Sequence, residues 1–414
     1  MTPPLYIALR FLGHRKRAFV LSMFGVVFGV AIFICTQAQT QGFAQHFINS
    51  TLGSNGSLVL RQKFQPLGSG LPVPPKTSAR HPGGTQRRYQ EGITNAREIM
   101  RVSRQFPNVA AASPVLRGTL SARAGFENAT VDLFGIDAAL HLQTTNLRQQ
   151  LIDGTFEAFR DNATSVIVGS KLAETLNIAA GDAIQLLSPG GDYWRFTVAA
   201  LARSGVGVVD SGRIYSHAKV AQTLLRKPFP ASMIIYKLRD PERAPALAEH
   251  FEALFQHDTQ SWQEREAANL QLFMMLRMSA AITVSLIILL AGFGIFNVLT
   301  MSVLSKVKEI AILRSMGYRK SDISAIFLWQ GGMIAGAGAV VGCVLGALLT
   351  WGVSKIPIRV RGLIVADHFV VTWDWRHYVS ATVLAIIAVA IASYVPARRA
   401  AHLPPVATLR GSGQ

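Results

Sequence analysis

Four long runs without a charged residue constrain this chain more than any other feature of its sequence. They cover Ala18–Ala38, Met278–Ser305, Ile323–Ser354 and Tyr378–Ala397, and are 21, 28, 32 and 20 residues long. A helix needs about 20 apolar residues to cross a bilayer, so each run is long enough to span one. The composition agrees, because 50% of the residues are hydrophobic and only 15% are charged. The sequence therefore predicts an α-helical membrane protein with four transmembrane helices.

The net charge of +18 is concentrated beside these runs, whereas residues 39–276 carry a balance of only +5. Twelve basic residues fall on one side of a four-span topology: Arg10, Arg15, Lys16, Arg17, Lys306, Lys308, Arg314, Arg319, Lys320, Arg398, Arg399 and Arg410. The short loop on the other side has four: Lys355, Arg359, Arg361 and Arg376. The positive-inside rule then places both termini and the central loop in the cytoplasm and the long segment in the periplasm. A nucleic-acid partner is not expected.

These features divide the chain into nine segments. The predicted spans are residues 18–38, 277–305, 323–353 and 377–396. Around them we expect an amphipathic cytoplasmic helix at 1–17, a periplasmic domain with stalk helices at 39–276, a cytoplasmic helix at 306–322, a short periplasmic loop at 354–376 and a cytoplasmic tail at 397–414. Pro396 and the two arginines after it are expected to stop the fourth helix.

The long outer segment has a mixed α/β pattern. Short apolar runs predict strands at Val109–Leu116, Ala129–Ile136, Ser165–Val168, Ala183–Leu187, Trp194–Ala202 and Ser232–Leu238. Periodic stretches predict helices at Thr94–Phe106, Gly169–Asn177, His217–Leu225 and Pro245–Phe255. Residues 66–84 hold five Pro and four Gly and predict a flexible basic loop, which is either a surface insertion or a partner site.

The basic connector Lys306–Asp322, KVKEIAILRSMGYRKSD, also reads as a helix. Ile310 and Leu313, and likewise Ile312 and Met316, recur at helical spacing. Arg314 and Gly317 are typical of a helix C-terminus. Apolar residues on several sides of a solvated helix predict that another surface covers them.

The sequence lacks the common signatures of catalysis. It has no G-x-x-x-x-G-K-[ST] phosphate loop, no H-E-x-x-H and no Cys/His cluster with metal-ligand spacing. The four runs contain no Asp, Glu or His that would indicate a proton relay. We therefore expect a non-catalytic subunit that binds no cofactor and no metal, and that receives energy from a partner.

Two features of the spans allow two interpretations each. Gly332 and Gly336, and then Gly338, Gly342 and Gly346, stand four apart, a spacing that permits close helix packing within one subunit or between two. Bulky aromatic residues in the spans suit either contact with an apolar cargo or ordinary packing at the transmembrane interface; they include Phe28, Phe33, Phe293 and Phe296.

The stretch KEIAILRSMGYRKSDI, Lys308–Ile323, resembles the signature of the FtsX/macrolide-exporter (MacB-like) ABC transporter permease superfamily. The ending Pro396-Ala397-Arg398-Arg399-Ala400-Ala401 is similar to the same family's, as is Val168-Gly169-Ser170-Lys171-Leu172-Ala173 in the outer segment. Within the superfamily the lipoprotein-releasing permeases are most similar, through Ile7-Ala8-Leu9-Arg10, Gln41-Gly42-Phe43 and Ile326-Phe327-Leu328-Trp329-Gln330-Gly331.

The resemblance implies a transmembrane permease subunit of an ATP-driven mechanotransmission complex in the bacterial inner membrane. Its cargo would be apolar, and the first interpretation is a lipoprotein; drug or peptide efflux with a periplasmic adaptor, or activation of a periplasmic cell-wall hydrolase, are the alternatives. ATP and Mg would bind to a dimer of partner ATPase subunits, and a second permease subunit and a periplasmic chaperone or adaptor are the other expected partners. The resemblance assigns ATPase coupling to Glu309, Ile310, Leu313, Arg314, Met316 and Gly317.

Overall fold

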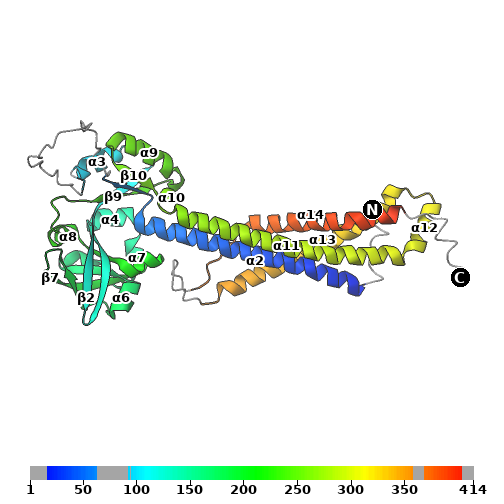
Figure 1. The fold of residues 1–414 in the computed structure, drawn as a ribbon, viewed down its shortest axis with the longest axis horizontal. Coiled ribbons are helices and arrows are strands. Elements are labelled where there is room, and N and C mark those ends of the chain that lie inside the picture. The colour runs from blue at the N-terminus through cyan, green and yellow to red at the C-terminus, as the bar shows by residue number, and fades with distance from the viewer. Residues whose placement is uncertain (1–15, 63–91, 94, 358–367, 403–414) are drawn as a thin grey trace, which may run out of the picture. The chain divides into compact units, whose positions relative to one another are not determined.

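The structure is a computed structural model that describes residues 16–62, 92–93, 95–357 and 368–402 (Figure 1). The chain divides into a helical unit, residues 1–44, 271–358 and 367–414, and an outer unit, residues 45–270 and 359–366. Several predicted segments lie wholly or partly outside the described residues: the helix at 1–17 up to residue 15, the loop at 66–84, residues 358–367 of the loop at 354–376, and residues 403–414 of the tail.

Long helices dominate the first unit. They are α2 (Lys16–Asn55), α11 (Ala267–Ser305), α13 (Lys320–Ser354) and α14 (Trp375–Ala401), with the short α12 (Val307–Ser315) between α11 and α13. All four long helices are long and apolar enough to cross a membrane, which confirms the predicted fold class. Both α2 and α11 are longer than the spans predicted inside them, and the boundary of the outer unit falls within each.

The helical unit has a packed apolar interior and an apolar exterior. Val30 of α2, Ile288 of α11, Ile334 of α13 and Ala385 of α14 are among the residues buried where the helices meet. The opposite faces expose further large apolar side chains, such as Leu290, which is 69% exposed. Helices that are apolar on all sides are typical of membrane spans.

The glycines of α13 separate into two groups. A Cβ atom built on Gly338, Gly342 or Gly346 would lie 2.8–3.1 Å from a Cβ atom of α2, and the three partners are Val26, Val30 and Ile34. A Cβ atom on Gly332 or Gly336 would meet no described atom within 4 Å. The first group therefore packs within the subunit, where the absence of side chains lets two helices approach closely.

The fourth helix does not end at Pro396, the last residue of the predicted span, and it continues two residues past the predicted stop at Pro396–Arg399. Pro396 is buried inside α14, and the helix continues to Ala401. Proline removes one backbone donor, but the turn beyond it is held by packing: Ala397 and Ala400 are buried against Ile323 and Phe327 of α13. Tertiary contacts here outweigh the local preference of proline.

The outer unit is built on one ten-stranded mixed sheet with the order β10-β1-β9-β2-β3-β8-β5-β7-β4, in which β6 pairs with β2 and β7. The strands are β1 (Leu58–Arg61), β2 (Val109–Ala124), β3 (Glu127–Ile136), β4 (Leu151–Gly154), β5 (Ser165–Gly169), β6 (Ala183–Leu187), β7 (Tyr193–Ala202), β8 (Arg213–His217), β9 (Met233–Leu238) and β10 (Asp258–Ser261).

Helices cover the sheet and close its apolar clusters. They are α3 (Ala96–Ser103), α4 (Ala138–Thr144), α5 (Phe156–Asp161), α6 (Ser170–Leu176), α7 (Gly207–Gly212), α8 (Ala218–Leu224), α9 (Ala244–Phe255) and α10 (Trp262–Arg265), with 3-10 turns at Leu147–Gln150 and Pro241–Arg243. Leu133, Val168 and Ile214 form part of one cluster, and Tyr236 and Phe251 part of another. The predicted mixed α/β domain is therefore confirmed.

Candidate functional site: the connector between the second and third spans

Helix α12 is set off from its neighbours by two local signals. Lys306 alone, with non-helical backbone angles, separates it from α11. At the other end Gly317 has a φ of +97°, which a glycine adopts without strain. The Gly317 N–H donates to the Arg314 carbonyl at 3.2 Å, and the Tyr318 N–H donates to the Leu313 carbonyl at 3.2 Å. This pair of hydrogen bonds is the Schellman motif, so α12 ends sharply before α13 begins.

The inner face of α12 belongs to the core of the helical unit. Ile310 is 1% exposed and Ala311 is 5% exposed. Ile310 packs with Ile323, Phe327 and Ala397, and thus with α13 and α14. Burying a side chain the size of isoleucine stabilises a fold by about 1.5–3 kcal/mol, so Ile310 anchors the connector to two other helices.

Arg314 adds a polar anchor on the same side. Its Nη1 donates to the carbonyl of Ala401, the last residue of α14, at 2.8 Å. That carbonyl is one of those left without an intrahelical partner at a helix C-terminus, and a cation there also suits the helix dipole. Arg314 therefore caps α14 from within the chain, at the end of the helical unit where α12 lies (Figure 1).

The outer face of α12 presents apolar and charged side chains together. Ile312 is 50% exposed and Met316 is 72% exposed, one helical turn apart. Lys308, four residues before Ile312, is exposed, and so are Arg319 and Lys320 just beyond the end of the helix. An exposed apolar pair of this kind with a basic rim has the chemistry of a docking surface for a partner with an apolar pocket and acidic edges.

The six predicted coupling residues are distributed over both faces. Met316 lies on the outer face, and so does Glu309, whose carboxylate pairs with Lys306 Nζ at 2.5 Å. Ile310 is turned into the core, Leu313 is half-buried against it, Arg314 caps α14 and Gly317 ends the helix.

The predicted helix at 306–322 is shorter than expected, because α12 covers only Val307–Ser315 and Lys320–Asp322 already form the first turn of α13. The six predicted coupling residues also omitted Ile312, although its four-residue spacing from Met316 places both side chains on one face of the helix.

The four phenylalanines considered for cargo contact do not share one environment. Phe33 is 7% exposed and belongs to the interhelical core, so it is not available to a cargo. Phe28 is half-exposed and its ring stacks on that of Phe24, with centroids 6.2 Å apart. Phe293 and Phe296 line an apolar groove of about 320 Å³ between α11 and α14.

Among the residues that the structure describes, no group of His, Cys, Asp and Glu has the arrangement of a metal site.

Comparisons with known proteins agree with this architecture. The model of the MacB-like periplasmic core domain matches residues 19–254, more than half of the chain, and that of the FtsX-like permease C-terminal domain matches residues 281–405. Among curated proteins, the lipoprotein-releasing system transmembrane protein LolC of Neisseria meningitidis serogroup B is 26% identical over 98% of both chains. The corresponding LolE protein of Haemophilus influenzae is 24% identical over 99% of both. The macrolide export ATP-binding/permease protein MacB of Acinetobacter baylyi is 33% identical over 33% of this chain and 19% of its own length.

The two family models fall on the two parts that the structure distinguishes, the α/β domain and the helices that follow it. Their order along the chain is that of one span, a large outer domain and three further spans. The chain therefore belongs to the FtsX/macrolide-exporter superfamily of ABC transporter permeases.

Proposed function

We propose that this chain is the transmembrane subunit of an ATP-driven complex of the mechanotransmission type that releases lipoproteins from the inner membrane. The proposal is supported by the similarity to LolC and LolE, which extends over almost the whole of each chain. The alignment with MacB of Acinetobacter baylyi covers 33% of this chain and 19% of that protein, although the model of the MacB-like periplasmic core domain matches residues 19–254. Lipoprotein release is thus favoured over export of a small molecule.

The observation that carries the coupling step is the two-sided character of α12. Its outer face offers Ile312 and Met316 to a partner, while Ile310 and Arg314 hold its inner face to α13 and α14. A push on the outer face is then transmitted to membrane helices and is not absorbed by a flexible loop. The chain has no phosphate-binding loop, so ATP and Mg would be bound by a separate ATPase dimer.

The remaining parts of the complex follow from the charge distribution and the family. The basic connector and both termini would face the cytoplasm, and the α/β unit the periplasm. A second permease subunit, identical or related, would complete the membrane part, and a periplasmic chaperone or adaptor would receive the cargo. The groove beside Phe293 and Phe296 has an almost wholly apolar lining, which suits an acyl chain rather than a polar solute.

Depletion of the protein tests the cargo. We expect lipoproteins destined for the outer membrane to remain in the inner membrane, where fractionation and immunoblotting would detect them. Unchanged lipoprotein sorting together with increased sensitivity to drugs or peptides would favour export instead. Unchanged sorting with defective cell separation would favour activation of a cell-wall hydrolase.

A further inference from the structure

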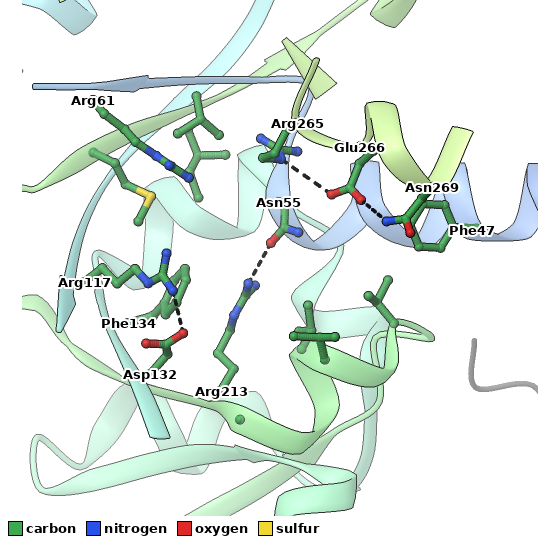
Figure 2. A pocket seen from close by; sticks show the side chains of 17 residues that line it. Phe47, Asn55, Arg61, Arg117, Asp132, Phe134, Arg213, Arg265, Glu266 and Asn269 are labelled. Atoms are coloured by element: carbon green, nitrogen blue, oxygen red, sulfur yellow. Dashed lines mark hydrogen bonds and ion pairs between the residues drawn. The ribbon is translucent and has the colours of Figure 1, made fainter. Parts of the chain in front are cut away.

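The outer unit contains a cavity of about 280 Å³ into which four arginines converge (Figure 2). They come from distant parts of the chain: Arg61 from β1, Arg117 from β2, Arg213 from β8 and Arg265 from α10. The last turns of α2 and the first turn of α11 close the cavity through side chains such as Asn55 and Asn269. All of the lining residues lie within the outer unit.

Positive charge exceeds negative charge in this cavity. Among the residues that the structure describes, two carboxylates line it: Asp132, 2.7 Å from Arg117 Nη2, and Glu266, 3.8 Å from Arg265 Nε. A third, Asp258, lies opposite Arg61 in the neighbouring strand β10 but does not line the cavity. Four guanidinium groups, which stay charged at any physiological pH, therefore face fewer carboxylates than they need for neutrality.

Arg213 is the most buried of the four, at 9% exposure, and its hydrogen bonds go to neutral groups. Nη2 donates to Asn55 Oδ1 at 2.8 Å, and Nη1 donates to Tyr215 Oη at 3.3 Å and to the Ser54 carbonyl at 3.5 Å. Its guanidinium also lies 4.0 Å from the centre of the Phe134 ring. These contacts fix the orientation of a buried charge without neutralising it.

Some N–H groups of Arg61 and Arg265 also lack a hydrogen-bond acceptor among the described residues. Within the described part of the chain, Arg61 Nε and Arg265 Nε and Nη1 are buried without a hydrogen-bond partner. Burial, together with the neighbouring Arg61 and Arg213, lowers the pKa of Arg265 to about 10, against the opposing effect of Glu266. Burial and the nearby Arg117 likewise lower the pKa of Arg61. Like charges held close together with unpaired donors are destabilising unless an anion joins them.

We propose that this cavity, which we name the arginine cavity, binds a phosphoryl group. A phosphoryl group presents several acceptor oxygens and up to two negative charges, and guanidinium groups bind it with paired hydrogen bonds. Apolar side chains such as Val59 and Ile235 line the same cavity, so the group could carry a short organic substituent. A second cavity shares Arg61 and Arg117 and is lined also by Lys227, which extends the basic surface. The inference does not depend on the proposed function.

The phosphoryl group has two sources, a lipid headgroup or a free phosphate, and thermal unfolding of the full-length protein in nanodiscs separates them. If the source is free phosphate, inorganic phosphate raises the melting temperature above that in chloride at equal ionic strength, in discs of any lipid. If the source is a lipid headgroup, replacing the disc lipid by one without a phosphate lowers the melting temperature, and added inorganic phosphate restores little of it.

Arg61→Gln and Arg265→Gln should each weaken the phosphate response by about tenfold to a hundredfold in concentration, the value of one charge-assisted hydrogen-bonding group. The matched control is Arg195→Gln, an exposed arginine on β7 outside both cavities, which should respond as wild type does. Without phosphate, Arg61→Gln should unfold at the same temperature as wild type or higher, because it removes one of several like charges.

If Arg265→Gln does not fold, Arg61→Gln decides the matter, since Arg61 is only half-buried. Two results would overturn the inference. One is a wild-type melting temperature that neither phosphate nor lipid phosphate changes. The other is a response that survives in both cavity variants.

Discussion

The exposed pair on α12 gives the sharpest test of coupling. Ile312 and Met316 are 50% and 72% exposed, and their neighbours on the inner face are buried. Complete burial of a side chain of this size is worth about 1.5–3 kcal/mol, so covering the exposed parts of both would contribute about 2–4 kcal/mol to docking. The double variant Ile312→Ser, Met316→Ser should therefore weaken ATPase binding by about 30-fold to several hundred-fold.

The assay titrates the ATPase subunit onto the permease in nanodiscs and follows both binding and permease-stimulated ATP hydrolysis. The double variant should keep the thermal stability of the wild type, because both side chains project outward. Ile310→Ala is the matched control from the inner face of the same helix. It removes a core side chain that is 1% exposed, so it should lower the stability of the helical unit by about 2–5 kcal/mol.

Loss of binding by the double variant without loss of stability would support docking through the outer face. Binding within about threefold of wild type would refute it, since that corresponds to less than about 1 kcal/mol. Gly317 is unsuited to this test. Its φ of +97° means that a larger residue would strain the end of α12, and a folding defect could not be told from a docking defect.

Three further predictions follow from contacts within each unit. Gly342→Leu should destabilise the protein in detergent by about 1–3 kcal/mol or more, because a Cβ atom there would lie 2.8 Å from Val30 Cβ, whereas Gly336→Leu should unfold as wild type does. Arg314→Gln should weaken the end of α14 by about 1.5 kcal/mol, which faster amide exchange around Ala401 would reveal. Burial, and then Arg213, lowers the pKa of His141 from 6.5 to about 3, so between these pH values the unfolded chain binds a proton that the folded chain does not. The unfolding free energy should therefore fall as the pH falls through this window, by up to about 1.4 kcal/mol per unit, and the loss should be smaller in His141→Gln.

The number of spans could be predicted because charge-free runs of this length have few other uses. The ends of the helices could not. After Ala38, α2 continues through Gly42 and Gly53 and ends only before Gly56, where the backbone turns with a φ of +67°. At Pro396 the sequence suggested a helix end that the structure does not have. Packing of the following alanines carries α14 past a residue that usually ends a helix.

The short edge strands of the outer domain could not be predicted from the sequence either. Strand β10 has the sequence Asp-Thr-Gln-Ser, with no apolar alternation, and it exists because β1 pairs with it along its whole length. By contrast, β5 was predicted from an apolar run and is buried on both faces, and the predicted β6 alternates buried and exposed residues. Local pattern therefore identified most inner strands of the sheet, β1 and β8 excepted, and pairing between distant segments determined its edges.

The connector and the arginine cavity differ in how much of each could be predicted from the sequence. The connector could be recognised because its residues are contiguous, and helical spacing alone separates Ile312 and Met316 from Ile310. The arginine cavity has no such signal. Its four arginines lie between positions 61 and 265, in different elements, and only the sheet order brings β1, β2 and β8 around one space.

The packing of the helical unit explains how one short helix could act on all four long ones. Lys306 alone separates α12 from α11, and Ile310 and Arg314 attach it to α13 and α14. α13 in turn contacts α2 at Gly338, Gly342 and Gly346, where no side chain intervenes on the glycine side. Close-packed helices do not deform continuously, so displacement of α12 would move them as a group. Since α2 and α11 both run on past the boundary of the outer unit, under the proposed function these are the two helices through which ATP-driven motion would reach the periplasmic domain.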